Sequence, residues 1–274
     1  MHSPRLSIVM ATWNRAHMVG RAIEAVRAQT FSDWELIISD DGSEDNTGEV
    51  ITEWAKKEPR IIYIRGPHQG IAKTYNQAFK LAKGEYIAMA DDDDPWCDPK
   101  KLEKQVAFLD AHPDYVGCGG GMIVVNPEGK ELYRYLKLET DAAIRDRMLF
   151  SNQMANSTTM FRRSVAEKIG WHDSDRKLAS DRDFWLTMGR EGKLYNFPEY
   201  FSYYTMSGTN VTIVNLRRAM KDAFLIMRKY KNDYPHYAPA YAFNFLQYLY
   251  GFIPVSIARP VHATLAHLRR LLVG

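Results

Sequence analysis

Short apolar runs alternate with segments of helical period along the first part of the chain. The apolar runs are 6–11, 34–39, 60–65 and 85–90, and each is typical of a strand buried in a sheet. The segments between them, in which apolar residues recur at helical spacing, are 17–29, 45–57 and 71–83. Strands separated by helices of this length are joined by parallel crossovers. The sequence therefore predicts an α/β fold, a Rossmann-like twisted and mostly parallel sheet with helices on both faces.

From residue 115 the pattern changes. Strand-like runs occupy 115–119, 122–126, 131–138 and 157–162. The glycine run Gly119–Gly121 separates the first two of these runs. A short helix is predicted at 164–170 and a further helix from about Ala179. This change divides the main domain into residues 1–114 and 115–215.

The last part of the chain, residues 216–274, is basic and aromatic. It holds nine Lys and Arg against two Asp and Glu, whereas residues 1–215 hold 27 against 31. A helix is predicted at 216–231, and the stretch 234–258 has many aromatic residues and no Lys, Arg, Asp or Glu. We therefore predict a C-terminal helical appendage to the α/β domain.

The pattern of this tail supports two interpretations. Alternating basic and apolar-aromatic stretches are typical of a helix that lies on an anionic membrane surface. Alternatively, the tail packs on the main domain or on a second subunit, which would make a homodimer. The side chains that would do so are Phe243, Leu246, Tyr250 and Ile253. A membrane-spanning helix is disfavoured because three prolines and Gly251 interrupt the apolar run.

Composition narrows the class of protein. With 274 residues, 46% of them hydrophobic and 25% charged, the chain resembles globular proteins and not disordered ones. Its two cysteines, Cys97 and Cys118, are too few for a disulfide framework or a four-ligand zinc site, so a reducing compartment is expected. The segment Met1–Leu6 lacks the apolar region of a secretory signal. These features predict a cytoplasmic protein, and no nucleic-acid partner is expected.

Four consecutive carboxylates, Asp91–Asp94, directly follow the apolar run 85–90. Open α/β sheets bind their ligands in the loops at the carboxyl ends of the strands. Neighbouring carboxylates raise one another's pKa unless a cation or a cluster of donors neutralises them. Oxygen ligands without His or Cys suit Mg²⁺ or Mn²⁺, which often share such sites with substrate phosphates. A divalent-cation site and a solvated acidic turn are the two interpretations of this run.

Polar residues also follow the other predicted strands. Thr12 and Asn14 come after the first strand, Asp40 and Asp41 after the second, and the loop Gly66–Gly70 after the third. The carboxyl ends of parallel strands meet at one edge of a sheet, so we expect these residues to converge with the four carboxylates on one cleft.

Six segments of the chain, in order, resemble the motifs of a known family. They are SIVMATWN at 7–14, QTFSDWELIISDDGS at 29–43, GIAKTYN at 70–76, KGEYI at 83–87, the carboxylates at 91–94 and ASDRDFWL at 179–186. The chain resembles the inverting glycosyltransferases of family 2, which have the GT-A fold, and several motifs in order are far more specific than one alone. The resemblance makes residues 1–114 the nucleotide-sugar-binding half and residues 115–215 the acceptor-side half of one GT-A domain.

The resemblance assigns nucleotide recognition to Thr12, Asn14 and Asp40. A carboxylate at Asp40 would accept the imide N–H of a uracil or the amide-type N–H of a guanine. Simple turn and capping chemistry explains Thr12 and Asn14 about equally well on local grounds. The resemblance also places Lys73 near phosphate, and a solvated position on a helix face is the alternative.

The four carboxylates match the Asp-X-Asp element of this family. The resemblance makes Asp93 the principal metal ligand and Asp91 the other end of the triplet, with Asp92 near the ribose. A run of four leaves the register ambiguous by one residue, so Asp94 is a further candidate. The implied cofactor is Mn²⁺ or Mg²⁺, which would stabilise the charge that builds on the departing nucleoside diphosphate.

The resemblance also implies a catalytic base. Matching ASDRDFWL to the family places this base at Asp181, which would take a proton from the acceptor hydroxyl. The alternative is that Asp181 merely caps the helix. The chain departs from the family in two places: Tyr75 stands where Arg or Lys is usual, and residues 203–212 lack the His that relatives often have there.

The expected activity is metal-dependent, inverting transfer of a sugar from a nucleoside-diphosphate sugar, with a UDP-sugar favoured, to a hydroxyl of a glycan or lipid-linked acceptor. A catalytically silent glycan- or nucleotide-binding domain is one alternative. Another nucleotide-sugar enzyme, such as a nucleotidyltransferase, is the second. A dinucleotide-binding oxidoreductase is disfavoured because no Gly-X-Gly-X-X-Gly follows the first strand. The expected location is the cytoplasm, with the tail on the inner face of the cell membrane if its membrane interpretation holds.

Overall fold

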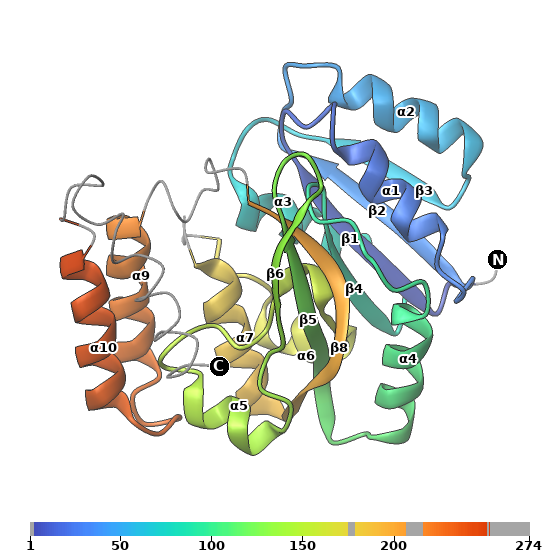
Figure 1. Ribbon diagram of the computed structural model, residues 1–274. Helices are drawn as coiled ribbons and strands as arrows, with labels where there is room; N and C mark the ends of the chain where they lie inside the picture. Colours follow the sequence, from blue (N-terminus) through green and yellow to red (C-terminus); the bar gives the residue numbers. More distant parts are fainter. Residues whose placement is uncertain (1–2, 175–178, 207–215, 251, 253–274) are drawn as a thin grey trace.

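The computed structural model describes residues 3–174, 179–206, 216–250 and 252 (Figure 1). Its strands are β1 (Leu6–Thr12), β2 (Trp34–Asp40), β3 (Ile61–Arg65), β4 (Tyr86–Asp91), β5 (Tyr115–Val125), β6 (Glu131–Tyr135), β7 (Met160–Arg162) and β8 (Lys193–Thr205). Its helices are α1 (Val19–Arg27), α2 (Thr47–Lys57), α3 (Ile71–Phe79), α4 (Lys101–Ala111), α5 (Asp141–Arg147), α6 (Arg163–Ile169), α7 (Ser180–Glu191), α9 (Leu216–Lys229) and α10 (Tyr237–Tyr250), with a 3₁₀ turn η1 at Asn156–Thr158.

The eight strands of the described chain form one sheet, in the order β3-β2-β1-β4-β7-β5-β6, with β8 beside β5. The four strands from the first half are parallel to one another. Strand β7 pairs antiparallel with both β4 and β5, so it joins the second half of the chain to the first. The predicted α/β fold with a mostly parallel region is confirmed, and both halves share one sheet.

Helices cover both faces of this sheet (Figure 1). Alternate residues of β1 enter opposite cores: Leu6, Ile8 and Met10 pack with α1, α2 and α4, whereas Val9 and Ala11 pack with α3, α6 and α7. This alternation follows from the two-residue period of a strand. Because both faces are buried, the strand reads in the sequence as one continuous apolar run.

Strand β5 crosses the glycine run without interruption, although two separate strands were predicted there. A Cβ on Gly119 would lie 2.6 Å from the side chain of Asn196, and one on Gly120 would lie 2.6 Å from Phe201. Both contacts come from β8, which runs parallel beside β5. The glycines therefore allow close packing of the neighbouring strand and do not mark a turn.

The predicted helical appendage is confirmed as α9 and α10, which lie side by side at the edge of the molecule (Figure 1). Helix α9 is firmly packed: Ile226, Met227 and Tyr230 are fully buried in the core that contains α7. Asn244 of α10 is also buried and donates hydrogen bonds to the carbonyl groups of Leu149 and Phe150. The tail thus packs on the main domain, as one interpretation expected.

The other face of α10 is exposed. Leu246, which was expected to pack, is 65% exposed, whereas Phe243 is half-buried beside Phe150. The side chain of Tyr250 and all of Ile253 lie outside the described residues. Within the described part of the chain, no helix has both the length and the apolar character that crossing a bilayer requires.

Candidate active site

The order of the strands creates a crevice at the carboxyl ends of β1 and β4. The chain moves from β1 to β2 on one side and returns to β4 on the other, so these ends form a topological switch point. The register places Thr12 opposite Asp40 on β2, and Ala11 opposite Asp91 on β4. The predicted convergence of the strand-end loops is therefore observed.

Asp91 is held by two donors that come from distant segments. The Tyr75 hydroxyl donates to Asp91 Oδ1 at 2.6 Å, and Asn156 Nδ2 donates to the same oxygen at 2.8 Å. Burial is the main reason that the pKa of Asp91 is raised to about 6, and the charges of Asp93 and Asp181 also raise it. The two hydrogen bonds lower this pKa and so oppose the shift. Both donors act on Oδ1, so Oδ2 is the oxygen of Asp91 that is better placed for a further ligand.

Asp92 and Asp93 face a single guanidinium. Arg15 Nε lies 3.8 Å from Asp92 Oδ1, and Arg15 Nη2 lies 3.8 Å from Asp93 Oδ2. Burial and the charge of Asp93 raise the pKa of Asp92 to about 7, opposed by the nearby Thr12 hydroxyl and by Arg15. That hydroxyl is itself buried, without a hydrogen-bond partner of ordinary geometry among the described residues. These carboxylates are therefore only partly neutralised.

Asp94 is tied to the second half of the chain. Its Oδ1 accepts a hydrogen bond from the backbone N–H of Thr205 at 3.2 Å, and its Oδ2 accepts one from Ser157 Oγ at 3.5 Å. Burial and the neighbouring carboxylates raise the pKa of Asp94 well above its usual range. Asp94 thus joins the acidic loop to β8 and η1, and Asp93 remains the more accessible carboxylate.

The donor set fits a hard divalent cation that a ligand completes. Carboxylate oxygens are the ligands that Mg²⁺ and Mn²⁺ prefer, and here they are more numerous than the neighbouring positive charges. Among the described residues, no group of three His, Cys, Asp or Glu side chains is already arranged around one point. A cation would therefore need oxygen atoms from a bound substrate in addition to Asp91 and Asp93.

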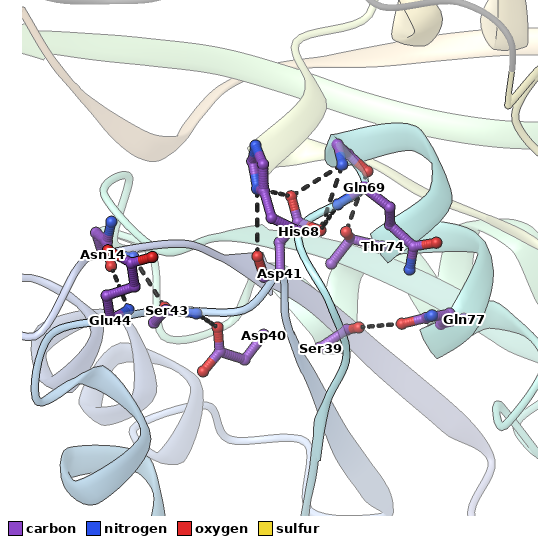
Figure 2. Close-up of polar contacts among 11 residues, drawn as sticks. Asn14, Ser39, Asp40, Asp41, Ser43, Glu44, His68, Gln69, Thr74 and Gln77 are labelled. Carbon is purple, nitrogen blue, oxygen red and sulfur yellow. Dashed lines mark hydrogen bonds and ion pairs between the residues drawn. The ribbon is translucent and has the colours of Figure 1, made fainter.

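Asn14 and Asp40 organise the neighbouring loops (Figure 2). Asn14, in the left-handed region with φ 54°, accepts a hydrogen bond from the N–H of Glu44 at 2.8 Å. Asp40 is fully buried: its Oδ1 accepts from the N–H of Ser43 at 2.8 Å and its Oδ2 from the Tyr63 hydroxyl at 2.7 Å. Asn14 thus makes the turn contact that was the alternative to direct recognition of a nucleotide, and both oxygens of Asp40 are already engaged within the protein.

A cavity of about 450 Å³ opens beside Asp40. Its lining includes Ser43, Gly48, Tyr63 and Arg65. A Cβ on Gly48 would lie 2.6 Å from the Tyr63 hydroxyl, so this glycine leaves room for the hydroxyl that donates to Asp40.

Asp41 organises the loop before α3, a role that the sequence did not suggest (Figure 2). Its carboxylate accepts from the N–H groups of Gln69 and Gly70, and His68 Nδ1 lies 2.9 Å from its Oδ2. The His68 ring stacks on Trp13 at 4.5 Å between centroids. Trp13 is 48% exposed, which makes it an accessible flat aromatic surface at the edge of the crevice. The signal for this role in the sequence is an aromatic residue, Trp13, inside the polar turn between Thr12 and Asn14.

Asp181 lies in the first turn of α7 but does not cap it. The N-cap position is Ala179, in the left-handed region with φ 55°, and no side chain caps this helix. Asp181 Oδ2 accepts a hydrogen bond from Asn152 Nδ2 at 2.8 Å. Asn156, four residues after Asn152, donates to Asp91, so one short segment contacts both carboxylates.

Asp183, two residues after Asp181, and Lys73 of α3 have different surroundings. Asp183 is buried and paired with Lys229 of α9 at 3.1 Å, so it joins the main domain to the tail. Lys73 is exposed on α3, and the described residues provide no ion pair for its ammonium group. The structure brings Thr12, Asp91, Asp92 and Asp93 together and leaves Lys73 at the surface.

Comparison with known proteins identifies the family. An open α/β sheet with a crevice at its switch point belongs to the class of proteins that bind their ligands at the carboxyl ends of the strands. The family model described as glycosyl transferase family 2 matches residues 7–170. The chain belongs to glycosyl transferase family 2 and is a glycosyltransferase.

Two bacterial relatives agree with this assignment. The chain is 32% identical over 201 residues to EpsE of Bacillus subtilis strain 168, named as a glycosyltransferase, covering 72% of this chain and 71% of that protein. It is 31% identical over 253 residues to WcaA of Escherichia coli K12, named as a colanic acid biosynthesis glycosyl transferase, covering 88% of this chain and 86% of that protein.

Solved structures share the fold. A mannosyltransferase from Pyrobaculum calidifontis, in complex with GDP-Man and Mn²⁺, has a TM-score of 0.66 at 16% identity and covers 100% of this chain and 81% of that chain. Residues 1–349 of Staphylococcus aureus TarS, in complex with UDP-GlcNAc, have a TM-score of 0.63 at 17% identity, covering 81% and 66%. The chain spans 43% of a longer TarS structure. These likenesses confirm the predicted GT-A fold.

Proposed function

We propose that the protein is a metal-dependent, inverting glycosyltransferase in which Asp181 is the general base. The observation that carries this proposal is that one short segment, residues 152–156, contacts both Asp181 and the acidic loop: Asn152 Nδ2 donates to Asp181 and Asn156 Nδ2 donates to Asp91, each at 2.8 Å. Asp181 would accept the proton of an acceptor hydroxyl while the oxygen attacks the anomeric carbon of the donor. The bond from that carbon to the diphosphate breaks on the opposite side, so the configuration inverts and the nucleoside diphosphate leaves.

Asp91 and Asp93 would hold Mn²⁺ or Mg²⁺. The bound cation would stabilise the negative charge on the leaving diphosphate. A solved mannosyltransferase structure with the same fold contains Mn²⁺ together with GDP-Man. Arg15 supplies the positive charge nearest to this loop in the described structure, within 3.8 Å of Asp92 and Asp93.

The donor is proposed to be a nucleoside-diphosphate sugar, with a UDP-sugar favoured. Thr12, Asn14 and Asp40 would form the nucleotide side, and Asp92 would lie by the ribose. Because Asn14 and Asp40 are engaged in turns, the exposed Trp13 ring is the more accessible surface for stacking a base. Lys73 would meet the diphosphate only if the side chain extends from its exposed position on α3. Among the solved structures with this fold, one holds UDP-GlcNAc and another holds GDP-Man, so both kinds of donor belong in the test.

A screen of sugar nucleotides tests the activity. UDP-, GDP- and dTDP-sugars are incubated with the purified protein and Mn²⁺, and release of free nucleoside diphosphate is measured with and without a cell-envelope glycan extract. Asp181→Asn is expected to lower kcat by about 10²–10⁴ with unchanged nucleotide binding, since the amide cannot act as a base. Nucleotide binding without turnover for every donor would instead support a catalytically silent domain.

The proposed acceptor is a glycan or lipid-linked sugar at an anionic membrane surface on the cytoplasmic side. Four residues of α10, Tyr241, Phe245, Leu246 and Leu249, recur at helical spacing, and with Phe252 just after the helix they form an apolar face that is 41–65% exposed. The Arg217 guanidinium lies 5.0 Å from the centre of the Phe252 ring, so positive charge borders this face. Basic residues beside exposed aromatic and aliphatic side chains favour an anionic lipid interface.

Point substitutions are the sharper test of this surface, because deleting the tail would remove the buried residues of α9. Leu246→Ser is expected to reduce co-sedimentation with phosphatidylglycerol vesicles, while the matched exposed change Leu225→Ser on α9 has less effect. Binding should weaken with salt and be absent for phosphatidylcholine alone. A protein that ignores such vesicles and forms a dimer that Leu246→Ser dissociates would show that a second subunit covers this face.

A further inference from the structure

Two asparagines of one short segment each hold one carboxylate of the crevice. This segment, residues 152–156, precedes β7. Asn152 Nδ2 donates to Asp181 Oδ2 at 2.8 Å, and Asn156 Nδ2 donates to Asp91 Oδ1 at 2.8 Å. We propose that Asn152 is a positioning residue for the catalytic base, an inference that rests on the proposed function of Asp181.

The orientation of the Asn152 amide follows from its other contact. The backbone N–H of Met154 donates to Asn152 Oδ1 at 3.1 Å, so this atom is the amide oxygen. The NH₂ group is therefore the part of the side chain that meets Asp181. Lys137 Nζ donates to the Asn152 carbonyl at 3.0 Å and holds the backbone on its other side. Asn152 is thus an oriented donor whose own position is supported at two points.

The hydrogen bond from Asn152 limits how Asp181 can act. A donor on Oδ2 stabilises the carboxylate form and hinders rotation of the group, so Oδ1 stays available for the acceptor hydroxyl. A base must stand within hydrogen-bond reach of the proton it takes, and small displacements reduce the rate strongly. Because Asn156 holds Asp91 from the same segment, the spacing between the base and the acidic loop is set by one short stretch of chain.

Asn152→Asp separates this role from a merely structural one. Asp keeps an oxygen that accepts from Met154 but introduces a second carboxylate, which repels Asp181 or shares a proton with it. Repulsion displaces Asp181 from its position, and a shared proton occupies the carboxylate that should accept the proton of the acceptor. We expect kcat to fall about 10- to 100-fold, the effect of one hydrogen bond to a charged group, while nucleotide affinity and donor KM stay within about twofold.

Comparison variants make the result specific. Asn232→Ala, an exposed asparagine of the tail, should leave kcat unchanged. Asn152→Ala removes the contacts with both Asp181 and Met154. If the role of Asn152 is purely structural, Asn152→Ala should be less active and less thermally stable than the parent protein, whereas Asn152→Asp should be fully active. That pattern would overturn the proposal. Equal melting temperatures of Asn152→Asp and the parent protein, together with the loss of kcat, would support it.

A double-mutant cycle distinguishes this proposal from the proposed function. If Asn152 acts through Asp181, Asn152→Asp causes no further loss when Asp181 is already Asn. Additive losses in the double variant would refute the positioning role while leaving Asp181 as the base. Full activity of Asp181→Asn alone would refute the proposed function itself, and the role of Asn152 with it.

Discussion

Asp92→Asn is expected to stabilise the metal-free protein at alkaline pH. Asp92 is 8% exposed, and burial with the charge of Asp93 raises its pKa from 3.8 to about 7. A shift of this size corresponds to a penalty on the order of 4 kcal/mol for the ionised carboxylate in the folded state. The amide loses the Arg15 contact at 3.8 Å, a partly exposed pair that contributes about 1 kcal/mol or less. With the desolvation of the amide, a net gain of about 1–3 kcal/mol remains.

The pH dependence gives the sign of this effect. Because the folded-state pKa of Asp92 is raised, the stability contributed by its protonated form is complete below pH 3.8 and is lost as the pH rises through about 7. The advantage of Asp92→Asn should therefore be absent near pH 4 and complete above pH 7. Urea unfolding in EDTA at several pH values measures it. A variant less stable than the parent at pH 8, or an advantage independent of pH, would refute the reasoning.

Two other substitutions test neighbouring carboxylates. Asp93→Ala is expected to abolish metal-supported donor binding without harming the fold, because this carboxylate lies in a repulsive surface loop; full activity in EDTA, or unchanged donor affinity, would contradict the metal role. Asp183→Asn should lower the free energy of unfolding by about 1–3 kcal/mol, because it weakens a buried contact with Lys229, yet leave kcat nearly unchanged. Unfolding and steady-state kinetics of Asp183→Asn, compared with those of Asp181→Asn, measure this. The expected outcome would show that Asp183 stabilises the fold, whereas Asp181 takes part in the reaction.

The first half of the fold was predictable because its strands are buried on both faces and read as apolar runs. The second half was less so. Helix α4 has a readable pattern, with Leu102, Val106 and Leu109 buried at helical spacing, but it was not predicted. Its first residue, Lys101, is a fully buried lysine over the Trp96 ring, and burial lowers its pKa to about 7. Because a lysine occupies a core position, the apolar pattern of this helix is incomplete, and apolar periodicity alone predicts the helix less clearly.

The roles of the four consecutive carboxylates could not be separated from the sequence. Their partners come from segments far apart along the chain: Tyr75 reaches Asp91, and Thr205 reaches Asp94. Tyr75 stands where the resemblance expected a basic residue, and the structure shows a neutral donor that supports a buried carboxylate instead. Such pairings depend on how the sheet brings α3 and β8 to the acidic loop, which local patterns do not encode.

The partners of the acidic loop divide its carboxylates into two kinds. Asp91 and Asp94 each accept hydrogen bonds from two groups, whereas Asp92 and Asp93 share one guanidinium at 3.8 Å. A loop that served only to stabilise the fold would gain by neutralising the second pair, because neighbouring carboxylates that repel one another destabilise the folded state. Their incomplete neutralisation favours a loop that a bound cation completes. A ligand that binds only the folded protein stabilises it by mass action, and a cation binds the ionised carboxylates. Mn²⁺ should therefore stabilise the parent protein most at the alkaline pH where the metal-free form is weakest.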